Sequence, residues 1–151
     1  MTEIAEMTDD ELQLAIARKL GWHTDVREIS GRSWMCRVLI TPSGEVYEDE
    51  FSMPWQFPCT PDMDRLLILN HTNHWPTDVE DALALCLDVR KRLNEQADAG
   101  EWALVFASGL LSDTVGLLYR CNGEDTHAIT ADGHNARAMA ELALRALQQD
   151  D

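Results

Sequence analysis

The chain has 151 residues, of which 27 are acidic and 12 are basic, so its formal net charge is −15. This length is typical of one domain, and a hydrophobic content of 45% is enough for a core, which excludes charge-driven disorder. The charge argues against direct binding to nucleic acid or to an anionic membrane. The four cysteines are scattered, the first residues carry no export signal, and no apolar run approaches about 20 residues. We therefore expect a cytoplasmic protein with reduced cysteines and no membrane span.

The N-terminal half has two regular patterns followed by an irregular stretch. Thr8-Asp9-Asp10-Glu11 is a capping box, which predicts a helix over residues 9–20 that ends at Gly21. Alternation over residues 33–40, a turn at 41–44 and a second run to Phe51 predict a β-hairpin. Residues 52–77 hold four of the five prolines, so we expect an irregular insertion there, with a short strand at residues 66–69.

The C-terminal half alternates between helix and strand patterns. Thr77-Asp78-Val79-Glu80 is a second capping box, which predicts a helix to about residue 96, with Arg90-Lys91-Arg92 complementing its C-terminal dipole. The strand expected at 101–108 is apolar on both faces and is therefore predicted to be central. Further predicted elements are a strand at 114–121, an Asn122-Gly123 hairpin turn, a strand at 126–130 and a helix at 135–147.

These elements predict a single domain over residues 1–151 with the order αββ–αβββα. The expected fold class is α+β, a layered α/β sandwich in which helices cover a mostly antiparallel sheet.

Three segments carry a family resemblance. They are the helix end Lys19-Leu20-Gly21-Trp22, the helix entry Trp75-Pro76-Thr77-Asp78, and the run from Trp102 and Val105 to Gly133 and an Ala-rich closing helix with Ala136, Ala138, Met139, Ala140, Ala143 and Leu144. In this order they resemble the phage ABA-sandwich domain family, small proteins encoded by bacteriophages and prophages, in which the second segment reads Tyr-Ser-Thr-Asp. The chain departs from the family at His134-Asn135, where Thr-Pro is typical, and in its long insertion. The resemblance implies a helix–sheet–helix sandwich in the bacterial host cytoplasm and no catalytic residues.

Acidic and aromatic residues are concentrated around the predicted hairpin and insertion. The acids could imitate a phosphate backbone, so we expect a basic or nucleic-acid-binding host protein as the partner. The aromatic residues could equally seal the loop over the core, and a homodimer is another assembly that the sequence allows. The predicted partner-binding residues are Glu45, Glu48, Asp49, Glu50, Met53, Trp55 and Phe57.

No catalytic motif is recognisable, and no cofactor is expected. Cys59, His71 and His74 are weak metal candidates, because paired Cys-x-x-Cys ligands are missing. The favoured function is therefore a non-enzymatic phage accessory protein that acts by binding, as an inhibitor of a host defence or nucleic-acid-handling protein. One alternative is a protein that sequesters a nucleotide signal by stacking on Trp55 or Trp75, and a second is a metal-dependent enzyme at Cys59, His71 and His74.

Overall fold

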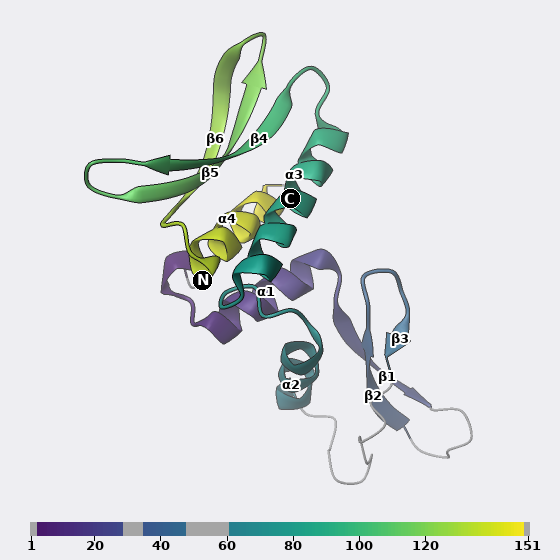
Figure 1. Cartoon of the computed structure of the whole chain (residues 1–151). Helices are drawn as coiled ribbons and strands as arrows, with labels where there is room; N and C mark the ends of the chain where they lie inside the picture. The colour runs from purple at the N-terminus through teal and green to yellow at the C-terminus, as the bar shows by residue number, and fades with distance from the viewer. Residues whose placement is uncertain (1–2, 29–34, 48–60, 150–151) are drawn as a thin grey trace. The chain divides into compact units, whose positions relative to one another are not determined.

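The computed structural model describes residues 3–28, 35–47 and 61–149. Within these residues the chain forms four α-helices and two antiparallel sheets of three strands each, which confirms the predicted α+β class (Figure 1). No helix of the described part is long and apolar enough to cross a membrane. The chain divides into two compact units, Ala17–Asn73 and the combination of Met1–Ile16 with His74–Asp151. The single-domain assignment stays a prediction.

Helix α1 (Asp9–Leu20) has the predicted bounds because both of its ends are set by local signals. At the start, the Thr8 hydroxyl accepts from the Glu11 amide at 3.1 Å, and the Thr8 amide donates to the Glu11 carboxylate at 3.3 Å, which confirms the capping box. At the end, Gly21 has a φ of 109°, and the Trp22 amide donates to the Ala17 carbonyl at 3.0 Å. This is a Schellman motif, which requires the left-handed conformation that glycine adopts without strain.

The unit Ala17–Asn73 contains one sheet in the order β1 (His23–Glu28), β2 (Met35–Ile40), β3 (Val46–Tyr47) and helix α2 (Pro61–His71), which contacts β1 and β2. The pairing of β2 with β3 confirms the predicted hairpin, whereas β1 was missed because its sequence is largely polar. The short strand predicted at residues 66–69 is wrong, since these residues belong to α2. Leu67 and Ile68 are buried while Leu66 is half exposed, so the apolar run is one stripe of a helix.

The second unit is built on a sheet in the order β4 (Glu101–Ser108), β5 (Asp113–Cys121), β6 (Glu124–Asp132). Helices α3 (Val79–Gln96) and α4 (Ala136–Gln148) pack against each other and against the sheet (Figure 1). The buried strand residues Val115, Leu117, Ile129 and Ala131 lie on one face of the sheet, and their alternate neighbours on β6 are exposed. This face, with α4, forms the core of the unit.

The central strand is β5, so the prediction that β4 is central is wrong. The outer edge of β4 meets α3 instead of another strand. The Asn94 side chain accepts from the Trp102 amide at 2.7 Å and donates to the Trp102 carbonyl at 3.3 Å. The side-chain amide thus replaces part of a neighbouring strand, which explains how an apolar strand can lie at an edge.

The ends of the other elements follow local chemistry, with small corrections. Asn122 and Gly123 have φ values of 55° and 81°, which confirms the predicted turn. Helix α4 is capped by Asn135, whose side chain accepts from the Ala138 amide at 2.8 Å. Helix α3 is capped by Asp78, one residue after the predicted Thr77. No basic residue lies in its last turn, so the prediction that Arg90-Lys91-Arg92 complements the dipole is wrong, because Asn94-Glu95-Gln96 continue the helix.

Candidate binding surfaces

The structure places only one of the predicted partner-binding residues. Glu45 is exposed in the turn between β2 and β3, where its amide donates to the Thr41 hydroxyl at 3.1 Å and its carbonyl accepts from the Thr41 amide at 2.9 Å. The other six residues, from Glu48 to Phe57, lie outside the described residues. The predicted surface therefore stays a prediction.

The metal and nucleotide alternatives gain no assembled site in the described part of the chain. Cys59 lies outside it, and Nδ1 of His74 is 3.3 Å from Oε1 of Gln13. Among the described residues no group of three His, Cys, Asp or Glu side chains is placed to hold a metal ion. Trp75 is only 5% exposed, so its indole is not available for stacking on a base, contrary to the expectation for that residue.

Cys86 is a core residue of α3 and not a candidate nucleophile. Its thiol is fully buried and donates to the Met139 carbonyl at 3.2 Å. Desolvation by burial raises the pKa of the Cys86 thiol to about 12. Since only the thiolate is a nucleophile, this thiol is unreactive near neutral pH.

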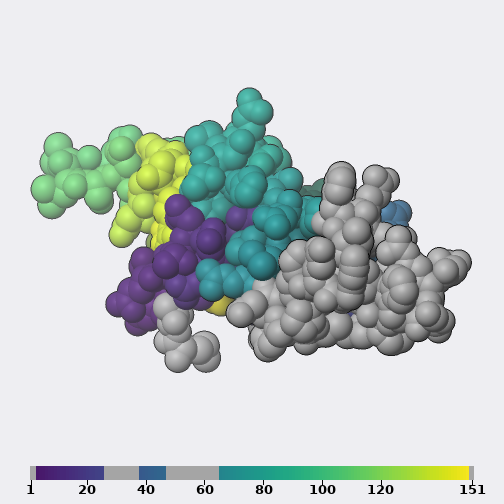
Figure 2. All heavy atoms as spheres, turned by 90° about the horizontal axis from the view of Figure 1, so that it is seen from below, coloured from purple at the N-terminus to yellow at the C-terminus, as the bar shows by residue number. Residues whose placement is uncertain are grey.

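The hairpin between β4 and β5 carries the most exposed apolar residues of the described chain. Leu110 and Leu111, at its tip, are 105% and 100% exposed, and Phe106 on the same hairpin is also exposed. The hairpin extends past α4 in the ribbon view, and the space-filling view shows it as a green arm beyond the yellow residues of α4 (Figures 1 and 2). This tip was not predicted from the sequence, although two adjacent leucines between two predicted strands are a signal that could have marked it.

The base of this hairpin is fixed to the start of α4. Nε2 of His134 lies 3.0 Å from the Ala107 carbonyl and 2.9 Å from the Thr114 carbonyl, so this nitrogen carries the proton and donates to both strands. The His134 ring also meets Phe106 edge to face, at 5.5 Å between ring centroids. The tip is therefore presented from a fixed base.

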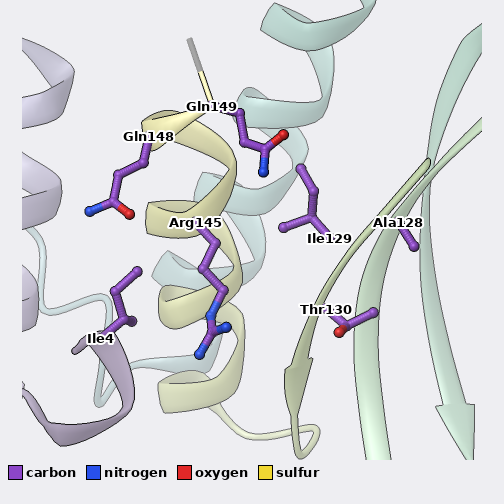
Figure 3. Close-up of a pocket in the computed structure, with 7 residues that line it drawn as sticks. All are labelled: Ile4, Ala128, Ile129, Thr130, Arg145, Gln148 and Gln149. Atoms are coloured by element: carbon purple, nitrogen blue, oxygen red, sulfur yellow. The ribbon is translucent and has the colours of Figure 1, made fainter. Parts of the chain in front are cut away.

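A second feature is a pocket of about 470 Å³ between η1 (Ile4–Glu6), the C-terminal end of α4 and strand β6 (Figure 3). In the close-up the Arg145 side chain lies between Ile4 on one side and β6 on the other. Nε of Arg145 is buried and has no hydrogen-bond partner within the described residues. An unsatisfied buried donor costs about 1–3 kcal/mol, so this group is unusual in a folded protein. No acidic residue lines the pocket.

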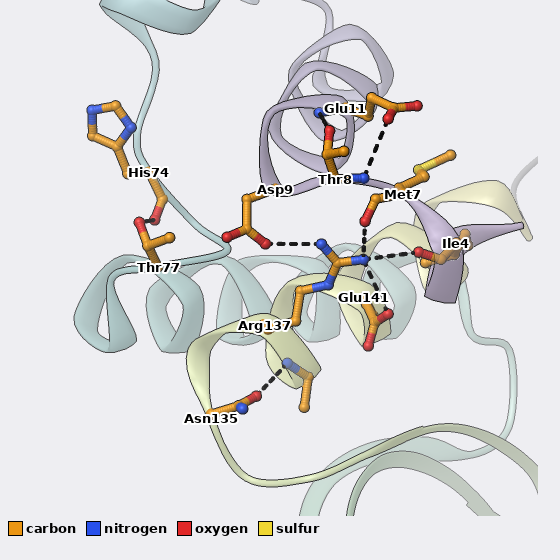
Figure 4. Close-up of polar contacts among 11 residues, drawn as sticks. Ile4, Met7, Thr8, Asp9, Glu11, His74, Thr77, Asn135, Arg137 and Glu141 are labelled. Atoms are coloured by element: carbon orange, nitrogen blue, oxygen red, sulfur yellow. Dashed lines mark hydrogen bonds and ion pairs between the residues drawn. The ribbon is translucent and has the colours of Figure 1, made fainter. Parts of the chain in front are cut away.

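Arg137, two turns earlier on α4, has the opposite environment (Figure 4). Its guanidinium donates to the carbonyls of Met7 at 2.6 Å and Ile4 at 3.1 Å, and pairs with Asp9 at 2.9 Å and Glu141 at 3.4 Å. Arg137 therefore holds the N-terminal segment on α4, and its donors have acceptors. Arg145 is therefore the arginine of α4 whose Nε lacks an acceptor among the described residues.

A third hollow, of about 440 Å³, lies on the sheet face opposite the core. Its floor is formed by Ala103, Val105 and Leu118, and its charged rim includes Arg120 and Asp125, which pair with each other at 3.1 Å. Because Arg120 and Asp125 pair with each other, neither calls for a charged ligand, and Glu101 is the remaining charged residue of the rim.

Comparisons with protein-family models, with curated proteins and with solved structures find no match for this chain. The resemblance to the phage ABA-sandwich family therefore stays a prediction.

Proposed function

We propose that this protein acts by binding another protein, with the tip of the β4–β5 hairpin as the contact, and that it is not an enzyme. One observation carries the proposal: Leu110 and Leu111 are fully exposed on an arm whose base is fixed. Burial of one leucine side chain by a partner yields about 1.5–3 kcal/mol. A pair of leucines held in water is therefore suited to insertion into an apolar pocket of another protein.

The charge of the chain indicates which partner fits. A net charge of −15 repels a second copy of the chain and anionic membranes, and attracts a basic protein. This supports the predicted basic or nucleic-acid-binding host protein over a homodimer. The phage origin and the inhibitory role belong to the same proposal and rest on the family resemblance.

The test is affinity purification from a bacterial lysate with three baits, followed by mass spectrometry. The baits are the wild-type protein, the double variant Leu110→Ser/Leu111→Ser, and the control Val79→Ser, which removes an exposed apolar side chain from α3. We expect a basic protein that binds the wild type and the control, and whose affinity for the double variant is lower by about a hundredfold or more. Binding should also weaken when salt is raised from about 0.1 M to about 1 M.

Two results would contradict the proposal. Equal recovery of the same proteins by the double variant would show that the hairpin tip is not the contact. A wild-type dimer that the double variant dissociates, measured by sedimentation, would assign the tip to a second copy of the chain instead.

A further inference from the structure

We propose that the groove between β6 and α4 binds an extended acidic segment of another protein, which adds to β6 as a fourth strand and places a carboxylate against Arg145. This inference goes beyond the proposed function, because it concerns other residues and a ligand of the opposite charge. It rests on three observations: a strand edge, an unpaired cation and a pocket that joins them (Figure 3).

The first observation is the outer edge of β6. Two observations fix which peptide groups of the sheet point outward. The two-residue turn at Asn122-Gly123 makes Cys121 and Glu124 a hydrogen-bonded pair of β5 and β6. On β4, the peptide groups of Trp102 bind Asn94 and therefore point away from β5. Along a strand, the peptide groups of successive residues point alternately to one neighbouring strand and to the other side. With the bulge near Tyr119 taken into account, this alternation points the peptide groups of Ala128 and Thr130 away from β5, to the outer edge of the sheet. No described residue forms a backbone hydrogen bond with them there. Both residues line the pocket.

The second observation is the charge of the groove. Arg145 is the charged residue that lines the pocket, and Gln148 and Gln149 line it nearer the C-terminal end of α4. A guanidinium presents its N–H groups in a planar fork that matches the two oxygens of a carboxylate. The amides of the two glutamines add polar donors elsewhere in the pocket. The polar groups of this pocket therefore favour an acidic ligand over a basic one.

The third observation is the path of the chain. After β6 the chain turns at Gly133, with a φ of 108°, and α4 runs back beside β6, so that its C-terminal residues line one pocket with Ala128 and Thr130. Side chains of an added strand point alternately to the two sheet faces. Those on the α4 face would meet Arg145, while the backbone bonds with the β6 edge. The backbone of the β6 edge thus supplies affinity for an added strand, and Arg145 selects a strand that carries an acidic residue.

The test begins with selection of short random peptides, displayed on phage, against the full chain. Selected peptides should share an Asp or Glu among β-branched residues. The variant Arg145→Gln should weaken their binding by about tenfold or more, because a charged hydrogen-bonded pair is lost. The control Arg120→Gln removes an arginine that is paired with Asp125 and should leave the affinity unchanged.

Two further variants separate the charge from the strand edge. The charge reversal Arg145→Glu should select peptides with Lys in place of the acid. The variant Thr130→Pro removes a donor from the outer edge only and should also weaken binding, with circular dichroism to verify the fold. Bound peptide should slow hydrogen exchange of the Ala128 and Thr130 amides.

Each part of the inference has a result that would overturn it. Selected peptides without an acidic residue, or with affinities that Arg145→Gln does not change, would remove the role of Arg145. Unchanged exchange of the Ala128 and Thr130 amides in the complex would exclude strand addition to β6. A selection that enriches no peptide for the wild-type chain would argue against the groove as a peptide site.

Discussion

Arg137 and Arg145, both on α4, have different roles because their surroundings differ. Arg137 has acceptors on η1, on α1 and on its own helix, whereas Nε of Arg145 has none among the described residues. The sequence does not distinguish them, because both are arginines on a predicted helix with apolar residues on either side. Only the position of the N-terminal segment, which reaches Arg137 from more than 100 residues away, separates a structural cation from an available one.

The variant Arg137→Met is predicted to lower the free energy of unfolding by about 2–3 kcal/mol. It would leave the carbonyls of Ile4 and Met7 without their donor and Glu141, whose side chain is 12% exposed, without its cation. The measurement is urea denaturation. The matched control Arg92→Met breaks a half-exposed pair with Asp88 on α3 and should cost less than about 0.5 kcal/mol. Equal losses in the two variants would contradict a stabilising role for the Arg137 contacts.

Among the secondary-structure elements, the contact between α3 and β4 decides how the sheet ends. Asn94 completes the hydrogen bonds of Trp102 at the outer edge of β4, so that part of this edge is closed to another strand. The outer edge of β6 has no backbone partner among the described residues. The two edges of one sheet therefore differ in function: the first is protected and the second is offered to a ligand.

The variant Asn94→Ala is predicted to destabilise the protein by about 1–2 kcal/mol, because the Trp102 amide and carbonyl lose their partners. Hydrogen exchange of the Trp102 amide should become faster than in the wild type. The control Gln96→Ala removes an exposed amide from the same helix end and should change neither quantity. If Asn94→Ala exchanged as slowly as the wild type, water or another group would have to replace the asparagine, and its role at the edge would be refuted.

Elements that are set by local sequence patterns could be predicted from the sequence, whereas those that depend on contacts between distant segments could not. The capping box at Thr8, the Asn122-Gly123 turn and the helix predicted at residues 135–147 follow from local patterns, and the structure confirms each of them. The edge position of β4 and the helix at α2 depend on contacts with distant segments, which a short apolar run does not reveal. The groove at Arg145 was out of reach for the same reason, since it joins η1, β6 and α4.

At the scale of the whole molecule, the surplus of acids opposes the folding of the chain. A net charge of −15 in 151 residues brings like charges together when the chain becomes compact. Favourable local placements offset part of this repulsion, for example Asp9, Asp10 and Glu11 in the first turn of α1, where the helix dipole attracts negative charge. The free energy of unfolding should therefore depend on the distance over which the remaining charges repel one another, which is set by the salt concentration.

We predict that added salt stabilises the protein against urea. When NaCl is raised from about 0.01 M to about 0.15 M, the Debye length falls from about 30 Å to about 8 Å, and repulsion between exposed acids is screened. The urea midpoint should rise with an unchanged slope, because the surface exposed on unfolding stays the same. The double variant Glu95→Gln/Asp98→Asn, which changes the net charge from −15 to −15 + 2 = −13, should respond less to salt. A midpoint that falls with salt would show instead that ion pairs such as Arg137 with Asp9 outweigh the net repulsion.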